Sequence, residues 1–257
     1  MIAIDRLTFG YSPSAPIFEE FSWSVQAGEA WCILGPSGCG KTTLLYLLAG
    51  LRRPTSGAVR IEGGALERPR PRTGLVLQDF GLLPWATVEE NVALGLQVRG
   101  FYGPDGRHAP QEEAAGPLAG RVGAWIDRMG LAGARLQFPG QLSGGQRQRA
   151  AIARTLALNP DLLLMDEPFG SLDAPTREDL QDLTLQLWAE RDLTLILVTH
   201  TLEEAAFLGR RILLIGRPPT RRAEVVENPL AGSPAFRQTG DYAQLCRDLR
   251  ARLGALA

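Results

Sequence analysis

The segment GPSGCGKT, residues 35–42, constrains the fold of this chain more than any other stretch of the sequence. It lies between an apolar run at residues 31–34 and a helical pattern that starts at residue 42 and closes at Gly50. Glycines let consecutive main-chain N–H groups converge on one anion, and the N-terminus of the following helix adds partial positive charge. Spacing and strand–loop–helix context together predict a phosphate-binding loop rather than a glycine turn with an exposed lysine.

Two side chains of this loop have the chemistry that a bound nucleoside triphosphate requires. Lys41 can reach the β- and γ-phosphates, and the Thr42 hydroxyl can ligate Mg²⁺. The residues that we expect to contact the nucleotide here are Gly35, Pro36, Ser37, Gly38, Cys39, Gly40, Lys41, Thr42 and Thr43.

An acidic motif follows another buried strand. In LLLMDEP, residues 162–168, four apolar residues lead to Asp166, and Glu167 comes next. Neighbouring side chains on an extended segment point in opposite directions. We therefore expect Asp166 to approach the metal through water, while Glu167 faces an attacking water on the other side. A solvated strand end is the alternative, and a phosphate loop in the same chain argues against it.

A second glycine motif, LSGGQ, occupies residues 142–146. Ser143 precedes a helix as its N-cap, Gly144 and Gly145 expose main-chain N–H groups, and Gln146 begins the helix. This is another anion cradle. One nucleotide does not need two separate cradles from one chain, whereas two copies of the chain that share two nucleotides would use both.

These motifs, in this order, resemble the ATP-binding-cassette family, and the resemblance covers nearly the whole chain. GPSGCGKT looks like its Walker A motif, LSGGQ like its signature motif and LLLMDE like its Walker B motif. Gln78 looks like the Q-loop glutamine, Asp173 lies in the D-loop, and His200 matches the switch histidine. Tyr11 takes the place of an aromatic residue that stacks on adenine. A structural role remains the alternative for His200, and a core or surface aromatic for Tyr11.

The resemblance implies an α/β fold, with a RecA-like P-loop NTPase core, an N-terminal antiparallel β subdomain and an inserted α-helical subdomain. It also implies a head-to-tail homodimer, in which each ATP contacts the Walker A loop of one copy and the signature motif of the other. Glu167 would polarise the attacking water, and His200 would contact the γ-phosphate. Gln78 would ligate the metal and link its site to the helical subdomain. The expected cofactors are ATP and Mg²⁺.

Features that the chain lacks narrow the choice within the family. It has no heptad coiled coil, no second cassette and no fused membrane-spanning segment, which leaves a stand-alone ATPase subunit that serves a separate membrane permease. LLPWATVEENVALGL and VTHTLEEAAFLGRRILLI resemble the nitrate, sulfonate and taurine importer ATPases. Importers of a thiamine precursor share these features. An exporter ATPase, a small-molecule P-loop kinase and a non-hydrolysing ATP clamp are further alternatives.

The expected location is the cytoplasmic face of the inner membrane, with the chain held there through its permease. A solute-binding protein would be an indirect partner. The formal net charge of -1 gives no general attraction to nucleic acid. Three cysteines form no disulfide framework, and the N-terminus lacks the pattern of a signal peptide, which favours a reducing compartment.

The hydrophobic pattern divides the chain into an ATP-binding core at residues 1–83 and 161–230, a helical subdomain at 84–160 and a helical tail at 231–257. The sequences TVEE and TLEE, which start at Thr87 and Thr201, predict capping boxes.

Residues 98–117 are rich in glycine and proline and predict a loop or a poorly ordered insert, which departs from the importer pattern. Residues 80–85 and the helix after them would line the groove for the permease's coupling helix. The alternative is that Leu82, Leu83 and Trp85 belong to the core.

Overall fold

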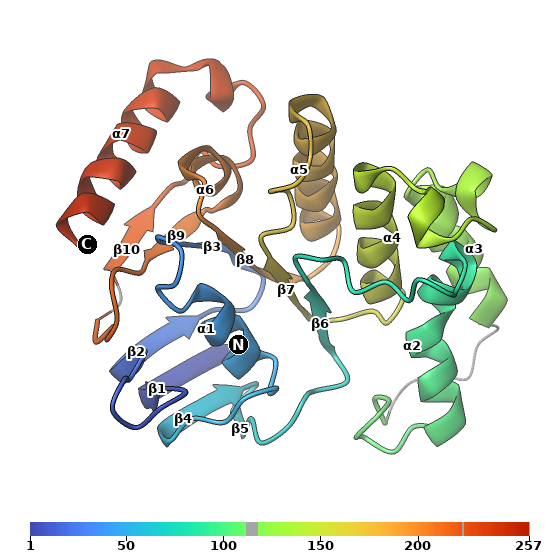
Figure 1. The fold of residues 1–257 in the computed structure, drawn as a ribbon, viewed down its shortest axis with the longest axis horizontal. Helices are drawn as coiled ribbons and strands as arrows, with labels where there is room; N and C mark the ends of the chain where they lie inside the picture. Colours follow the sequence, from blue (N-terminus) through green and yellow to red (C-terminus); the bar gives the residue numbers. More distant parts are fainter. Residues whose placement is uncertain (112–117, 223, 257) are drawn as a thin grey trace.

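The computed structural model describes residues 1–111, 118–222 and 224–256, which form two β-sheets with helices packed around them (Figure 1). An antiparallel sheet comes from the N-terminal part of the chain. Its strands, in spatial order, are β2 (Phe18–Val25), β1 (Ile2–Phe9), β4 (Ser56–Ile61) and β5 (Gly64–Ala65). Strands β1 and β2 bury mainly alternate residues, because only one face of this sheet packs against the core.

The second sheet is mostly parallel and runs through the centre of the molecule. Its strands, in spatial order, are β10 (Glu224–Glu227), β9 (Arg211–Leu214), β3 (Ala30–Leu34), β8 (Thr194–Thr199), β7 (Leu162–Asp166) and β6 (Thr73–Val76). Only β10 runs antiparallel to its neighbour. Every residue of β3, β7 and β8 is buried, as in a parallel sheet that is covered on both faces.

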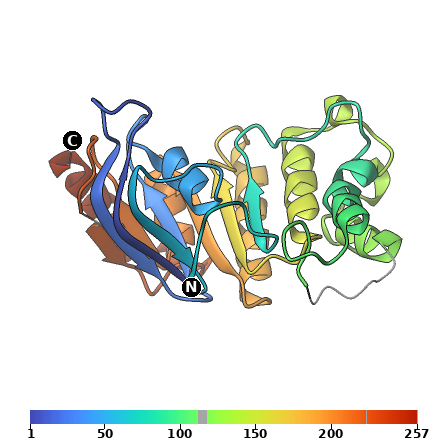
Figure 2. The same cartoon turned by 90° about the horizontal axis from the view of Figure 1, so that it is seen from below.

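The helices fall into two groups. Around the sheets lie α1 (Lys41–Leu48), α5 (Ala174–Ala189), α6 (Leu202–Leu208) and α7 (Gly240–Ala255). At the end of the molecule far from the antiparallel sheet lie α2 (Val88–Tyr102), α3 (Leu118–Arg128) and α4 (Gly144–Leu156) (Figures 1 and 2). Three short 3₁₀ turns complete the described elements: Ala132–Ala134, Pro139–Gln141 and Phe236–Gln238. No helix in the described ranges is long and apolar enough to cross a bilayer.

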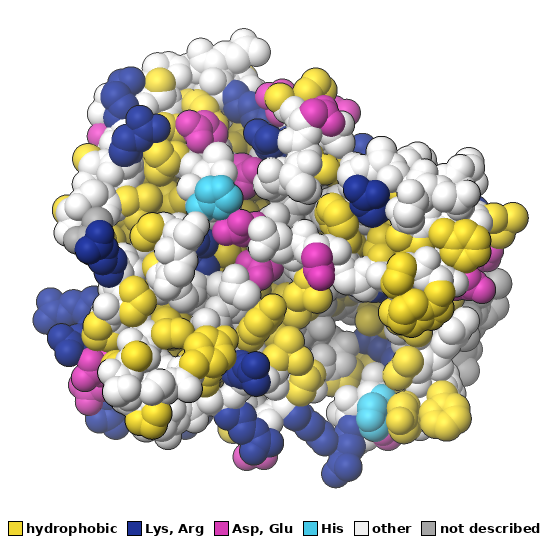
Figure 3. All heavy atoms as spheres, viewed as in Figure 1, with side chains coloured by type: hydrophobic (Ala, Val, Ile, Leu, Met, Phe, Trp, Pro, Cys, Tyr) yellow, Lys and Arg dark blue, Asp and Glu magenta, His cyan; other side chains and the backbone are white. Residues whose placement is uncertain are grey.

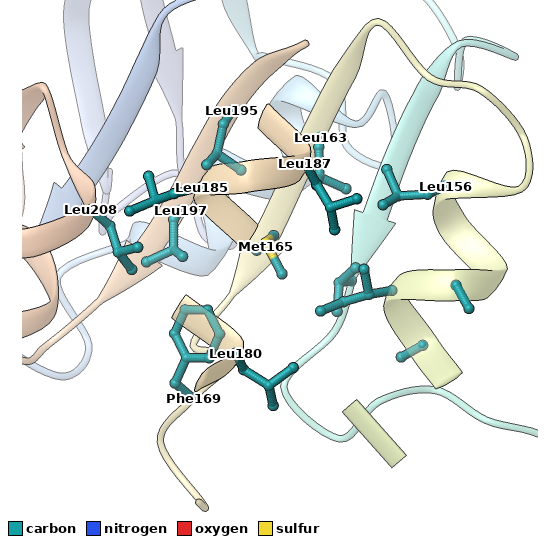
Figure 4. Packing of buried hydrophobic residues seen from close by; sticks show 14 of the residues in the cluster. Leu156, Leu163, Met165, Phe169, Leu180, Leu185, Leu187, Leu195, Leu197 and Leu208 are labelled. Carbon is teal, nitrogen blue, oxygen red and sulfur yellow. The ribbon is translucent and has the colours of Figure 1, made fainter. Parts of the chain in front are cut away.

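Two apolar clusters hold these layers together, one on each face of the parallel sheet. Strand β7 contributes to both, because its successive side chains alternate between the faces. Leu162 and Leu164 pack with α1 and the antiparallel sheet. Leu163 and Met165 pack with α4 and α5 on the other face (Figure 4).

The sheet order decides where the site lies. Strands β3, β8, β7 and β6 are consecutive neighbours and run in the same direction, so their carboxyl ends meet at one edge. The segments that leave these four ends contain the phosphate loop, His200, Glu167 and Gln78. Ligands bind at this edge in open α/β sheets.

Two local expectations were wrong. Residues 98–102 are not a loop but the last turn of α2, whose C-cap is Gly103. Buried Arg99 stabilises this turn by donating to the carbonyl oxygens of Leu158 and Pro71. Part of the expected insert, residues 112–117, lies outside the described residues.

The second error concerns the capping box at Thr201, which does not form. The Glu204 carboxylate is buried and accepts a hydrogen bond from the Thr199 hydroxyl at 2.6 Å. The Thr199 oxygen in turn accepts a hydrogen bond from the Thr201 N–H at 3.0 Å. The predicted capping box at Thr87 is confirmed.

Candidate nucleotide-binding site

The phosphate loop has the predicted strand–loop–helix form, between β3 and α1. Gly40 caps α1 in the left-handed region, with φ of 106°, and a Cβ there would come within 2.3 Å of the Ile17 side chain. A Cβ at Gly35 would lie 2.3 Å from the Ile215 carbonyl oxygen. Glycine is therefore required at both positions. Ser37 and Gly38, at the tip, are exposed.

Lys41 lies under this loop and is 5% exposed. Its Nζ donates to the carbonyl oxygens of Gly35 at 2.9 Å and Pro36 at 3.0 Å, and it lies 3.9 Å from a carboxylate oxygen of Glu167. A phosphate oxygen in the loop would offer this ammonium a charged acceptor in place of neutral carbonyls. Burial raises the pKa of the Cys39 thiol, which keeps it neutral beside this lysine.

Thr42 and Asp166 come together as a metal site would require. The Thr42 hydroxyl donates to Asp166 Oδ1 at 3.0 Å. Asp166 is 3% exposed, and burial raises its pKa, an effect that the Thr42 hydrogen bond and Lys41 oppose. A buried carboxylate beside a hydroxyl fits Mg²⁺, which binds one or two carboxylates together with substrate phosphates and water. The described residues contain no cluster of three or more His, Cys, Asp or Glu side chains that could hold a metal by itself.

Glu167 faces the same loop, and the reason differs from the one expected. Strand β7 ends at Asp166, and Glu167 has a left-handed backbone with φ of 44°, so strand alternation does not apply to it. The turn directs its carboxylate toward Lys41, toward the Gln78 amide at 3.4 Å and toward His200 Nδ1 at 3.1 Å. Figure 3, which has the same view as Figure 1, shows acidic side chains and a histidine together near the middle of the face turned to the viewer.

The loop, Tyr11, Gln78 and Glu167 line one open pocket of about 450 Å³. Tyr11 is 63% exposed, so it is not a core residue. Its hydroxyl lies 3.4 Å from the Thr43 hydroxyl, and its ring meets Phe9 edge-on. This leaves ring surface accessible beside the phosphate loop, where a nucleotide base could stack.

The second glycine motif forms the expected helix cap but lies outside this pocket. We call Ser143, Gly144, Gly145 and Gln146 the signature cradle. The exposed Ser143 side chain caps α4 by accepting from the Gln146 N–H at 3.2 Å, and Gln146 Oε1 accepts from the Ser143 N–H at 2.9 Å. Gly145 packs against Thr176, whose N–H is capped by Asp173 at the start of α5. Within one chain, Asp173 therefore lies beside the signature motif and not beside the phosphate loop.

Several residues that were not predicted from the sequence line the pocket or hold its loops in place. Ile17 lines the pocket, Glu204 supports the strand end before His200, Asn91 binds the loop at residues 83–87, and Arg154 binds the turn after Gln78. Most of these contacts join distant segments or depend on burial, and residue spacing carries no signal for them. Asn91 is the exception, since it lies four residues after the helix-capping Thr87.

Comparison with known proteins agrees with this geometry. Residues 18–170 match the family model described as ABC transporter, which is more than half of the chain. The chain belongs to the ABC transporter family. The taurine import ATP-binding protein TauB of Escherichia coli K12 is 42% identical over 224 residues, which cover 87% of this chain and 83% of that protein. TauB of Shigella flexneri matches to the same extent.

Solved structures of ABC proteins have the same fold. The ATP-binding cassette MJ0796, in a dimeric post-hydrolysis state bound to ADP and Pi, superposes with a TM-score of 0.74 at 29% identity, covering 88% of this chain and 98% of that one. CbiO1 from Clostridium perfringens, at 22% identity, supports the fold alone, with a TM-score of 0.75 over 99% of this chain and 96% of that one. As an ABC ATPase, the chain binds and hydrolyses ATP.

Proposed function

We propose that two copies of this chain close head to tail on two Mg-ATP and thereby drive a membrane permease that imports a small sulfonate such as taurine. The decisive observation is the separation of two complete phosphate cradles. The pocket around Lys41 has no contribution from Ser143, Gly144, Gly145 or Gln146 among its described lining residues. The signature cradle is exposed at its Ser143 tip, which suits a phosphate held by another copy.

The residues around the pocket have separable roles in hydrolysis. Bound Mg²⁺ would be held by Thr42, Asp166 and Gln78 and would neutralise charge on the β- and γ-phosphates. Lys41 would move from its two carbonyl partners to the γ-phosphate. Glu167, freed from that ammonium, would accept a hydrogen bond from the attacking water and orient it. His200, which lies 3.1 Å from Glu167, would hold that carboxylate and reach the γ-phosphate.

Closure follows from where the ATP lies. Because each nucleotide would bridge two copies, its γ-phosphate binds the closed dimer preferentially and shifts the population toward it. Tyr11 would stack on the adenine, and Asp173, beside the signature motif, would lie at the subunit boundary.

An exposed loop, which the Asn91 carboxamide holds by hydrogen bonds, supports the permease partner. Trp85 is 74% exposed, so it is not a core residue, whereas Phe80 and Leu82 pack partly against the core. Leu136, at 74% exposed, and Phe138, at 45%, lie in the same helical part of the chain, and apolar side chains gather over that end in Figure 3. Clusters of exposed aromatic and aliphatic side chains are typical of protein interfaces. The permease would hold the chain at the membrane surface.

Crosslinking between copies tests the shared site. Chains carrying Ser37→Cys are mixed with chains carrying Ser143→Cys, both in a Glu167→Gln, Cys246→Ser background, and treated with a short bis-maleimide. Both serines are exposed. We expect a crosslinked dimer that requires ATP. Pairing Ser37→Cys with Ser233→Cys, another exposed serine, serves as the control and should give none. Equal crosslinking with and without ATP, or none at all, would contradict the head-to-tail arrangement.

The solute assignment rests on the likeness to TauB and has its own test. The chain is expressed in Escherichia coli lacking TauB, and uptake of labelled taurine is measured. Restored uptake that is lost in the Glu167→Gln variant would support the assignment. Expression at normal level without uptake would count against it.

A further inference from the structure

The chain makes a strained turn between the metal site and the helical subdomain. After β6 ends, Gln78 and Asp79 are followed by two left-handed residues, Phe80 with φ of 65° and Gly81 with φ of 57°. The Phe80 N–H donates to the Leu77 carbonyl oxygen at 3.0 Å. A left-handed backbone is sparsely populated for phenylalanine, so this turn requires support from elsewhere.

Arg154, in the last turn of α4, supplies that support. Its Nη1 donates to the Gly81 carbonyl oxygen at 2.5 Å and its Nη2 to the Phe80 carbonyl oxygen at 2.9 Å. Within the described part of the chain this guanidinium forms no salt bridge. Burial lowers its pKa and the nearby Asp79 opposes that effect, but an arginine side chain stays protonated. Both Nη groups of this guanidinium therefore donate to main-chain carbonyl oxygens of the turn.

Arg147 contacts the same turn through the Phe80 ring and also reaches the signature motif. Its guanidinium lies 5.7 Å from the centre of the Phe80 ring, a cation–π distance. Its Nη1 donates to the carbonyl oxygen of Leu142, the residue before Ser143, at 2.8 Å. Arg147 and Arg154 are seven residues apart, two helical turns, so they share one face of α4.

We propose that Arg147 and Arg154 are positioning residues, which together act as a two-arginine clamp that couples the Gln78 turn to the signature cradle. The contacts form a continuous path from Gln78 through Phe80 and Arg147 to Leu142 and Ser143. When Gln78 engages the metal site, any shift of the turn is passed to α4, whose N-terminus is the cradle for the other copy's ATP. This inference rests on the proposed function, because it requires Gln78 and Ser143 to act on ATP.

The test measures ATP binding and turnover separately in the full-length chain. Arg154→Lys and Arg147→Lys keep the charge but lose the planar fork. The matched control is Arg149→Lys, on the same helix; among the described residues, its guanidinium donates only to the Met129 carbonyl oxygen, at 3.5 Å. We expect kcat to fall by about tenfold in each clamp variant, with the Kd for a fluorescent ATP analogue changed less than about twofold. The control should match the wild type in both.

Two further readouts exclude a merely structural role. The Gln78→Ala, Arg154→Lys double variant should have a kcat less than about twofold below that of Gln78→Ala alone. The reason is that the clamp acts through the turn that carries Gln78. Hydrogen exchange at residues 78–83 should quicken in Arg154→Lys, while the thermal unfolding midpoint stays close to that of the control.

Several outcomes would overturn the clamp: turnover near wild type in both variants, losses that multiply with Gln78→Ala, or ATP affinity that falls in step with kcat. Failure of the proposed function looks different. In that case the chain without clamp substitutions would give no ATP-dependent crosslink between Ser37→Cys and Ser143→Cys.

Discussion

Replacing Asn91 by alanine should loosen the loop that presents Trp85 without altering the nucleotide pocket. Asn91 is fully buried on α2, and its carboxamide makes four hydrogen bonds to that loop. Oδ1 accepts from the Leu83 N–H at 2.8 Å. Nδ2 donates to the carbonyl oxygens of Leu83, Ala86 and Thr87 at 3.1, 2.9 and 3.0 Å.

The size of the effect follows from which groups lose their last partner. The Thr87 oxygen keeps the bond from the Asn91 N–H, and the Leu83 oxygen keeps one from the Ala86 N–H. Among the described residues, the Leu83 N–H and the buried Ala86 oxygen have no other hydrogen-bond partner. At about 1 kcal/mol for the partly exposed N–H and about 2 kcal/mol for the buried oxygen, the free energy of unfolding should fall by about 3 kcal/mol. For a chain of this size that corresponds to a melting temperature lower by about 6 to 12 °C.

Asn228 provides the matched control. It is 3% exposed, and its Nδ2 donates to the Ala206 and Gly209 carbonyl oxygens at 2.7 and 2.9 Å, far from the Trp85 loop in sequence and in the fold. Urea denaturation should show a loss of stability in both alanine variants. Hydrogen exchange at residues 83–87 should quicken only in Asn91→Ala. A stability loss below about 1 kcal/mol, or unchanged exchange in the loop, would show that Asn91 does not hold this loop in place.

Three further outcomes can be checked on the purified chain. Glu167→Gln should lower ATP turnover by about 100-fold or more while ATP still binds, measured by phosphate release and by titration; near-normal turnover would remove Glu167 from its role. Lys41→Met should weaken ATP binding by about tenfold or more, since it loses a charge-assisted bond to phosphate, and an unchanged Kd would contradict that contact. Burial raises the pKa of Glu204 above its ordinary value of 4.5, partly offset by Thr199. The folded chain then binds the Glu204 proton more tightly than the unfolded chain. The free energy of unfolding should therefore decrease as pH rises from about 4.5, the pKa in the unfolded chain, through the higher pKa of the folded chain. Glu204→Gln should abolish this decrease, and equal pH slopes in denaturation of both proteins would argue against it.

Features that depend on neighbouring residues were predictable from the sequence. The phosphate loop, the N-cap at Ser143 and the capping box at Thr87 rest on main-chain N–H groups within three or four residues of one another. The buried strands β3, β7 and β8 are continuous apolar runs, and their burial on both faces follows from that composition. The order of the motifs then carried the family resemblance.

The tertiary structure decided how these pieces meet. Glu167 faces Lys41 through a left-handed turn that strand alternation does not predict. Glu204 binds Thr199 rather than capping its own helix, because burial makes the threonine hydroxyl its available donor. The sequence alone determined the two cradles and the strands that precede the site, since these need only local spacing and apolar content. The sheet order brought four strand ends to one edge, and packing of α4 placed two arginines on the Gln78 turn, because contacts between distant segments depend on the whole core and not on spacing.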